Sequence, residues 1–208
     1  MLLAHPPAPE VMSVLSHDPV LTHIIANGKS LKSAKSEDLY FKLLSSIVSQ
    51  QLSTKVAATI FRRFLELFPE QYPYPDLVLS APNETLRGAG LSFQKIGYLR
   101  NVAMFAAKGN LNHAIIDALE DEELIKHLTQ IKGVGRWTVE MLLMFALERP
   151  DVLPVDDVGI QNAMKRHYGL TETGKALRVR MAEIGESWRP YRTIACKYLW
   201  QSLDNEPK

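Results

Sequence analysis

Hydrophobic residues recur at three- and four-residue steps along most of the chain, which is the spacing of an amphipathic helix. The clearest run extends from Tyr40 to Leu52, and the same period continues from Val56 to Leu65. The pattern predicts further helices at Glu122–Gln130, Trp137–Leu147, Val158–His167 and Tyr191–Leu203. No run alternates as a half-buried strand does, so the sequence predicts an all-α fold.

Proline and glycine separate these helices. The proline-rich stretch Phe68–Asp76 predicts a loop, and Ser80 is a candidate N-cap for the helix that follows it. Gly88 and Gly90 then interrupt the chain before the next apolar run. Because there is no long linker, repeat or low-complexity tract, any division into lobes must fall in short loops near residues 36 and 149.

Composition places few limits on the partner. The 208 residues can bury a real core, and 24 Lys and Arg against 23 Asp and Glu leave a net charge of only +1. Any charged site must therefore be local. The apolar start "MLLAHPPAPE" lacks a basic region and is broken by prolines, and no run is long enough to span a bilayer. We expect no membrane partner and an intracellular protein, in the cytoplasm of a prokaryote or the nucleus of a eukaryote.

The single cysteine, Cys196, excludes a disulfide framework, a cysteine-based zinc site and a four-cysteine iron–sulfur cluster. It is expected to be a small buried apolar residue. The six histidines show no metal-ligand spacing, so no catalytic transition metal is expected. Hydrolytic or binding chemistry is favoured over redox chemistry.

A short glycine pattern separates two of the predicted helices. Gly133 and Gly135 flank Val134, which suits a tight turn with positive φ and close approach of the backbone to a ligand. The alternative is an ordinary helical hairpin with a glycine at its C-cap.

The residues after the glycines fit an anion site. Trp137 and Thr138 open the next helix, so uncovered amides and a helix N-terminus would face a phosphate. Lys132 and Arg136 add positive charge at the same turn, which would make binding depend on salt.

Paired acidic and paired amide residues have simple structural explanations. Asp156 and Asp157 precede an apolar-periodic helix, so one could cap it and the other could favour its dipole. Gln50 and Gln51 fall at the end of a predicted helix, where two solvated helix formers are ordinary.

Several of these motifs occur in an order that resembles one family. "LTQIKGVGRWTVEMLLMF" and "LPVDDVGI", with "SSIVSQQLSTKVA", "GLSFQKIGYL" and "WRPYRTIACKYLW", resemble the helix-hairpin-helix (HhH-GPD) DNA glycosylase superfamily. The chain is most similar to 3-methyladenine DNA glycosylases of the AlkA and Mag type. The resemblance implies a helical barrel lobe over residues 37–149 and a second helical lobe from residues 1–36 and 150–208. It also implies an active site in the cleft between the lobes and no iron–sulfur cluster.

The resemblance implies a monofunctional DNA glycosylase of base excision repair, acting as a monomer on double-stranded DNA that contains alkylated bases. It would hydrolyse the N-glycosidic bond of flipped-out 3-methyladenine and 7-methylguanine, with ethenoadenine and hypoxanthine as further candidates, and leave an abasic site. Asp157 takes the catalytic position, where a carboxylate stabilises positive charge on the sugar and orients water. Asp156 would then be the helix cap.

Two tryptophans bear on the reaction. Bifunctional members carry a nucleophilic lysine where this chain has Trp137, so we expect water to attack and no AP lyase activity. Trp200 falls where the AlkA pattern has an aromatic residue that stacks on the extruded base, a cation–π preference of about 0.5–2 kcal/mol for a cationic purine. Met141, one turn after Trp137, occupies a base-pocket position where an aromatic residue is expected. The alternative is that both tryptophans are core residues.

The resemblance also assigns the contacts with DNA. Gln51 would be the wedge that fills the gap left by the flipped base, with Leu52 as apolar support and either residue a candidate for the wedge itself. Contacts with the DNA backbone are expected from Ser53, Lys132, Gly133, Gly135, Arg136 and Thr138. No catalytic cofactor is implied, but the carbonyls of Thr129, Ile131 and Val134 would hold a structural Na⁺ or K⁺.

A second function class stays open. A non-catalytic helix-hairpin-helix protein that binds damaged DNA would need the hairpin but would have no use for a buried carboxylate such as Asp157. The combination of Asp157 with Trp137 and Trp200 favours the enzyme.

Overall fold

The chain divides into two compact units in the computed structural model, which describes residues 7–31, 36 and 38–204. We call residues 36–142 the hairpin unit, and residues 1–35 with 143–208 the terminal unit. Every regular element in the described residues is helical, which confirms the predicted all-α class. Residues 1–6, which begin the stretch considered as a signal peptide, lie outside the described residues. Within the described part, no helix has the length and apolar character needed to cross a membrane.

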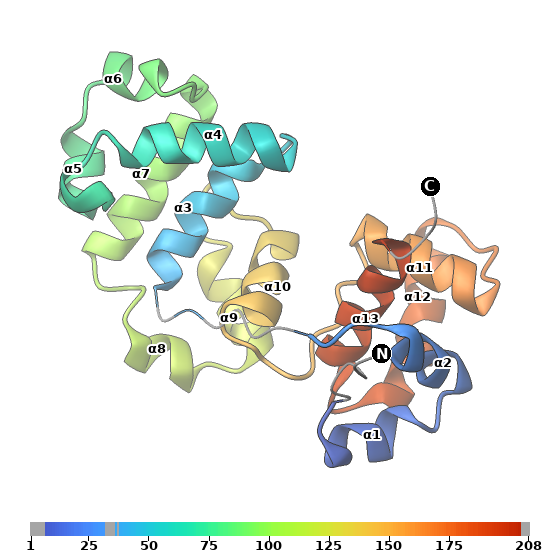
Figure 1. Ribbon diagram of the computed structural model, residues 1–208. Helices are drawn as coiled ribbons and strands as arrows, with labels where there is room; N and C mark the ends of the chain where they lie inside the picture. The colour runs from blue at the N-terminus through green and yellow to red at the C-terminus, as the bar shows by residue number, and fades with distance from the viewer. Residues whose placement is uncertain (1–6, 32–35, 37, 205–208) are drawn as a thin grey trace. The chain divides into compact units, whose positions relative to one another are not determined.

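The hairpin unit is organised around one helix, α7 (Phe93–Ala107), whose apolar face is buried at Ile96, Leu99 and Val102. Helices α3, α5 and α6 pack against it (Figure 1). The remaining elements are α3 (Leu39–Ser49), α4 (Thr54–Leu65), η1 (Pro69–Gln71), α5 (Pro75–Ser80), α6 (Asn83–Gly88), α8 (His113–Ala118), α9 (Asp121–Leu128) and the start of α10 (Arg136–Phe145).

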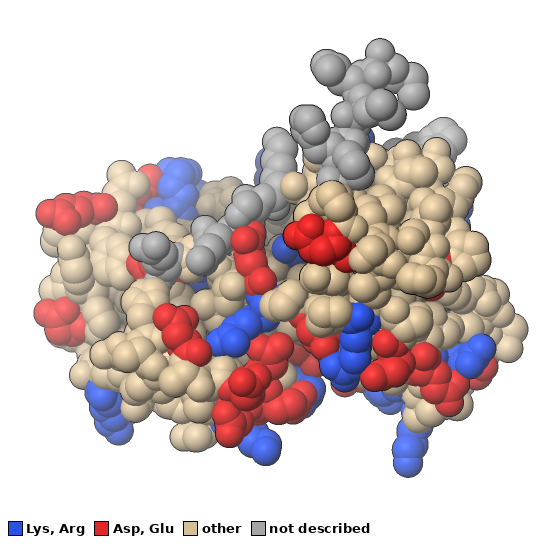
Figure 2. Space-filling model, turned by 90° about the horizontal axis from the view of Figure 1, so that it is seen from below, with Lys and Arg blue, Asp and Glu red and all other residues tan. Residues whose placement is uncertain are grey.

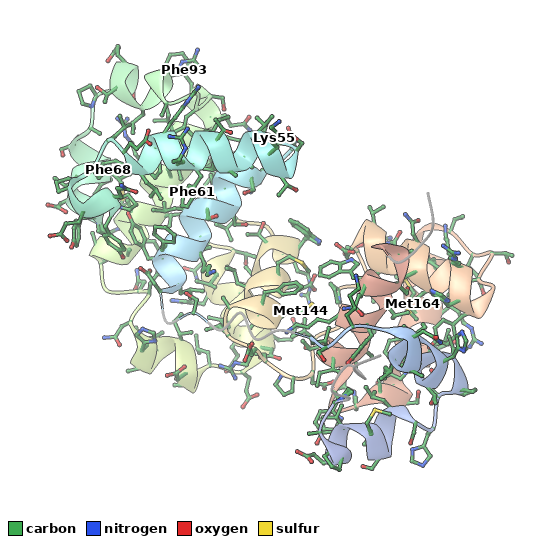
Figure 3. All side chains as sticks on the ribbon, viewed as in Figure 1. Lys55, Phe61, Phe68, Phe93, Met144 and Met164 are labelled. Atoms are coloured by element: carbon green, nitrogen blue, oxygen red, sulfur yellow. The ribbon has the colours of Figure 1, made fainter. Side chains whose placement is uncertain are left out.

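An aromatic cluster fills the region between α3, α4 and the segment that follows α4. The Phe61 ring lies 5.2 Å from that of Phe41, and the Phe64 ring lies 5.1 Å from that of Phe68. Figure 3 shows Phe61 and Phe68 among the side chains of this unit. Phe64 is fully buried, so the cluster anchors α4 against α3 and the segment that follows α4.

The terminal unit is organised around α13 (Arg192–Asp204), which packs against α2 and α11. Its other elements are α1 (Pro9–Leu15), α2 (Pro19–Asn27), the end of α10, α11 (Val158–Tyr168), α12 (Gly174–Gly185) and η2 (Glu186–Trp188). Trp188 is fully buried, and its indole N–H donates to Asp18 Oδ2 at 2.9 Å. Asp18 also caps α2, so one carboxylate links the start of α2 to η2. Cys196 is buried, as predicted.

Two local predictions are wrong. Ser80 does not cap a helix: it ends α5, and α6 begins at Asn83 after Pro82. The reason is that a proline disfavours helical geometry in the residue before it, so a helix cannot run from Ser80 through Ala81 into Pro82. The stretch Phe68–Asp76 is not only loop, because it contains η1 and the start of α5, where Pro75 occupies a first-turn position that tolerates proline.

Candidate active site and DNA-binding elements

Asp157 is a buried carboxylate, 6% exposed, held by two donors at the start of α11. Its Oδ1 accepts hydrogen bonds from the Ile160 amide and from the Trp200 indole N–H, both at 2.8 Å. Asp157 is therefore the N-cap of α11, and the expectation that Asp156 is the cap is wrong. The reason is that only the residue directly before the first helical turn can reach the third amide of the helix. Asp156 lies one residue earlier, where it is exposed and pairs with Arg178.

Trp200 is fixed from two sides by residues of the terminal unit. Its ring stacks on Phe145 with centroids 5.3 Å apart and planes 12° apart, and its N–H is bound to Asp157. Gly159 makes this approach possible, since a Cβ there would lie 2.8 Å from Trp200 Cδ1 and 3.0 Å from Asp157 Oδ1. Trp200 is thus an ordered part of the Asp157 site and not merely a core aromatic.

The sequence interpretation did not identify Gly159 or Phe145 as site residues. The glycine within "DDVGI" was a usable signal, because a glycine in the first turn of an apolar helix often marks close approach of another group. Phe145 gave no such signal among other apolar residues of its helix. Lys197 Nζ lies 5.1 Å from the centroid of the Phe145 ring, and burial lowers the pKa of this lysine.

This arrangement suits the stabilisation of positive charge. Two hydrogen bonds fix Oδ1 and therefore the plane of the Asp157 carboxylate. A fixed anion in a site of low water content stabilises a cationic transition state without reorganising during the reaction. The stacked Phe145 and Trp200 rings next to it are of the kind that attract cations.

The glycine hairpin lies between α9 and α10 in the hairpin unit. Gly133 has φ 107°, as predicted for a tight turn, and a Cβ there would lie 2.7 Å from Tyr98 Cβ. Gly135 does not have positive φ and has open space around it, directly before the N-terminus of α10. The amides around Gly135 are therefore those that an anion can approach. Thr138 is 4% exposed, so only its backbone is suited to such a contact.

Arg136 acts as a brace between the two hairpin helices. Its Nη1 donates to Glu122 Oε2 at 3.1 Å, Nη2 pairs with the other oxygen of Glu122, and Nε donates to Glu140 Oε1 at 2.9 Å. The hydrogen bond that Arg136 donates to Glu122 raises the pKa of Arg136 and lowers the pKa of Glu122. Its charge is thus compensated by two carboxylates, which disfavours the expected role in binding phosphate.

Lys132 is an exposed cation of the hairpin, whereas Arg136 is exposed but paired with carboxylates. Figure 2 shows Lys and Arg interspersed with Asp and Glu across one face. Phosphate binding is therefore expected to rest on backbone amides and a few lysines more than on a broad basic surface.

Replacing Arg136 by methionine is expected to lower the free energy of unfolding by about 1–3 kcal/mol. The half-exposed pair with Glu122 contributes little, but Glu140, which also accepts a hydrogen bond from Arg136, is a buried carboxylate. The contribution of Glu122 is present at neutral pH and is lost as pH falls through its lowered folded-state pKa.

The dependence of DNA affinity on salt should hardly change for R136M, whereas K132M should reduce the slope of that dependence by about one phosphate contact. Denaturant unfolding at two pH values and binding titrations over a salt series measure these effects. A large change in the salt slope of DNA affinity for R136M alone would show that Arg136 binds phosphate and does not only link the two helices.

The loop after α3 carries the predicted wedge. Helix α3 ends at Ser49, and Gln51 is exposed with φ 58°, a conformation that costs a non-glycine residue about 1–3 kcal/mol. Leu52 is exposed, and Ser53 precedes α4 without making a side-chain cap. Gln50 and Gln51 are therefore not helix residues, contrary to the simpler explanation.

The loop after α3 (Gln50–Ser53, the wedge loop) and the hairpin line one surface depression. It is lined by Ser46, Ser49, Gln50, Gln51, Leu52 and Trp137. Trp137 is 45% exposed, which contradicts its alternative as a core residue. Met141 is half-buried in the same helix.

The predicted monovalent cation site involves backbone carbonyls of the hairpin. The Ile131 carbonyl accepts from the Val134 amide at 2.9 Å, which leaves it a second lone pair for a cation. Thr129 ends α9 as its C-cap, where helix carbonyls are left without helical partners. This donor set fits Na⁺ or K⁺, and the site remains a prediction. Among the described residues, no cluster of His, Cys, Asp and Glu could hold a metal ion.

Comparison with known proteins gives one family. Residues 44–190 match the HhH-GPD superfamily base excision DNA repair protein family. The crystal structure of a DNA-3-methyladenine glycosidase from Bacillus halodurans is similar with a TM-score of 0.85 and 36% identity, covering 96% of this chain and 91% of that one. The Schizosaccharomyces pombe 3-methyladenine DNA glycosylase Mag1, in complex with abasic DNA, gives a TM-score of 0.81 and 33% identity, covering 96% and 100%.

A longer relative also matches. The Bacillus subtilis protein YfjP is 34% identical over 80% of this chain, which spans 59% of that relative's length.

Proposed function

Because the chain belongs to the HhH-GPD superfamily of base excision DNA repair proteins, we propose that it is a monofunctional DNA glycosylase that removes alkylated purines from double-stranded DNA. The observation that carries this proposal is the buried Asp157 carboxylate, fixed by Ile160 and Trp200. Capping of α11 explains the bond to Ile160, but a cap alone requires neither burial of the carboxylate nor the bond from Trp200. The solved relatives support the same reaction, since both are named as 3-methyladenine glycosylases.

The reaction needs stabilisation of charge more than it needs an acid. The bond between C1′ and the base nitrogen breaks, and its electron pair leaves with the base. Positive charge then develops on the sugar, where the Asp157 carboxylate stabilises it. Water adds to C1′ and gives up a proton, which leaves an abasic site. An N3- or N7-alkylated purine is already cationic, so it leaves as a neutral base without protonation.

The rings near Asp157 support a preference for cationic lesions. The Trp200 indole is held in place by Phe145 and Asp157, so it offers a preformed stacking surface. A cationic purine would gain about 0.5–2 kcal/mol over a neutral one on such a surface. We therefore assign 3-methyladenine and 7-methylguanine as substrates, and expect slower release of ethenoadenine and hypoxanthine.

The hairpin unit would bind the DNA duplex. The amides around Gly135 bind a phosphate, Lys132 adds charge, and Gln51 with Leu52 enters the stack as the base is extruded. The Thr129, Ile131 and Val134 carbonyls would hold a monovalent cation beside that phosphate. The protein would act as a monomer.

Strand breakage is the test of the monofunctional proposal. The chain has Trp137 where an amine nucleophile would be needed, so water is the nucleophile. An end-labelled duplex with a single 7-methylguanine should stay intact after reaction and break only after alkali. Borohydride added during the reaction should trap no covalent complex. Breaks without alkali together with a trapped complex would show a lyase and overturn this part of the proposal.

A further inference from the structure

One face of α7 contacts both DNA-binding elements of the hairpin unit. Lys95, Tyr98 and Asn101 are spaced three residues apart, so they lie along one side of the helix. Two of them belong to the stretch "GLSFQKIGYL", to which the proposed reaction gives no role. Each of the three contacts either the wedge loop (Gln50–Ser53) or the hairpin turn.

Lys95 holds the start of the wedge loop. Its Nζ donates to the Val48 carbonyl at 2.6 Å and to the Gln50 carbonyl at 2.9 Å. These carbonyls lie at the C-terminus of α3, where an ammonium group is favourably placed against the helix dipole. Gln51 follows directly, with its φ of 58°. The ammonium thus fixes the backbone on the N-terminal side of a residue in an unfavourable conformation.

The other contacts reach the hairpin. The Asn101 side chain donates to the Lys132 carbonyl at 3.0 Å, and the Tyr98 ring occupies the space that a side chain at Gly133 would need. The Gln50 amide completes the link, because its Nε2 donates to the Gly133 carbonyl at 3.0 Å. The wedge loop and the hairpin are therefore bound to each other and to the same helix face.

We propose that this face of α7 couples phosphate binding by the hairpin to base extrusion by the wedge loop. Lys95 is the positioning residue that holds Gln51 in the conformation that enters the duplex. This inference rests on the proposed function and on Gln51 as the wedge. A wedge must oppose the restacking of the base at the moment of extrusion, so a loop free to relax would lose this step first. Burial lowers the pKa of Lys95, but two carbonyl acceptors favour its charged form.

The test compares a paired lesion with one that needs no extrusion. Lys95→Met should lower the single-turnover rate on 7-methylguanine paired with cytosine by about tenfold or more, as expected when a preorganised geometry is lost. On the same lesion in a single-base bulge, its rate should stay within about twofold of wild type. Fluorescence of 2-aminopurine beside the lesion should show weaker unstacking on binding. Lys95→Arg, which can still donate to both carbonyls, should restore both signals.

Controls separate this role from general damage. Lys108→Met makes the same change at the exposed C-cap of α7 and should behave as wild type. Hydrogen exchange should rise at residues 50–53 in K95M while the core of α7 keeps its protection. Equal losses on paired and bulged lesions, or wild-type rates on both, would overturn the role of Lys95. A wild type that unstacks DNA but releases no base would refute the proposed function alone, and one that does neither would refute both.

Discussion

Replacing Asp157 by asparagine is expected to slow base release by on the order of 10²–10³-fold, the usual cost of removing one preorganised electrostatic group. The change is nearly isosteric. An asparagine carbonyl can accept the same hydrogen bonds from Ile160 and Trp200 that Oδ1 accepts now. Asparagine is also an N-cap as good as aspartate, so α11 should stay folded. The variant therefore removes the charge and retains the geometry.

Single-turnover release of 7-methylguanine measures this effect, with DNA affinity and thermal unfolding measured alongside. D157N should bind the lesion duplex about as tightly as wild type and unfold at a similar temperature. Asp156→Asn is the matched control, because this neighbouring aspartate is exposed and pairs with Arg178. If D157N retained wild-type rates, or if D156N lost as much activity as D157N, Asp157 would not be the charge that the reaction needs.

Replacing Gly133 by alanine is expected to destabilise the hairpin by about 2–4 kcal/mol. Two costs combine: overpacking against Tyr98 contributes about 1–3 kcal/mol, and a positive φ at a residue with a Cβ contributes about 1 kcal/mol more. The new Cβ would meet Tyr98 Cβ at 2.7 Å, and the turn has φ 107°. Because the Gly133 carbonyl also accepts from Gln50, DNA affinity should fall along with stability.

Gly135→Ala is the matched control two residues away. A Cβ there meets nothing within 4 Å, and the residue does not have positive φ. Its free energy of unfolding should change by less than about 0.5 kcal/mol, as at most surface sites. Any loss of DNA affinity in G135A would then report on close approach of a phosphate. Denaturant unfolding of both variants gives the comparison. Equal stability of the two would contradict the claim that the turn requires a glycine at 133 but not at 135.

The spacing of apolar residues predicted most of the fold, and the order of the motifs led to the proposed site residues. The period of apolar residues located α4, α9, α10, α11 and α13 to within a few residues, because each buries one face. It did not single out α8 or α12, which are short or have few buried apolar residues. The glycine pattern suited a tight turn with positive φ, which Gly133 has, but it did not distinguish Gly133 from Gly135, which does not have positive φ.

Contacts between residues distant in sequence could not be predicted. Nothing in the sequence indicates that Trp200 donates to Asp157 or that Glu122 neutralises Arg136. The choice between Asp156 and Asp157 as the cap depends on where the helix begins to within one residue, which is finer than a periodic pattern can resolve. The pairing of Lys95 with two carbonyls of α3 likewise depends on the packing of α3 against α7.

We propose above all that this chain breaks the glycosidic bond of a cationic purine by water attack. The most direct measurement is chromatography of the free bases released when purified wild-type protein reacts in excess with a duplex that holds one 7-methylguanine. We expect release of 7-methylguanine in step with the appearance of alkali-labile sites. Tight binding of that duplex with no release of the free base would contradict glycosylase activity and favour a protein that senses damage without repairing it.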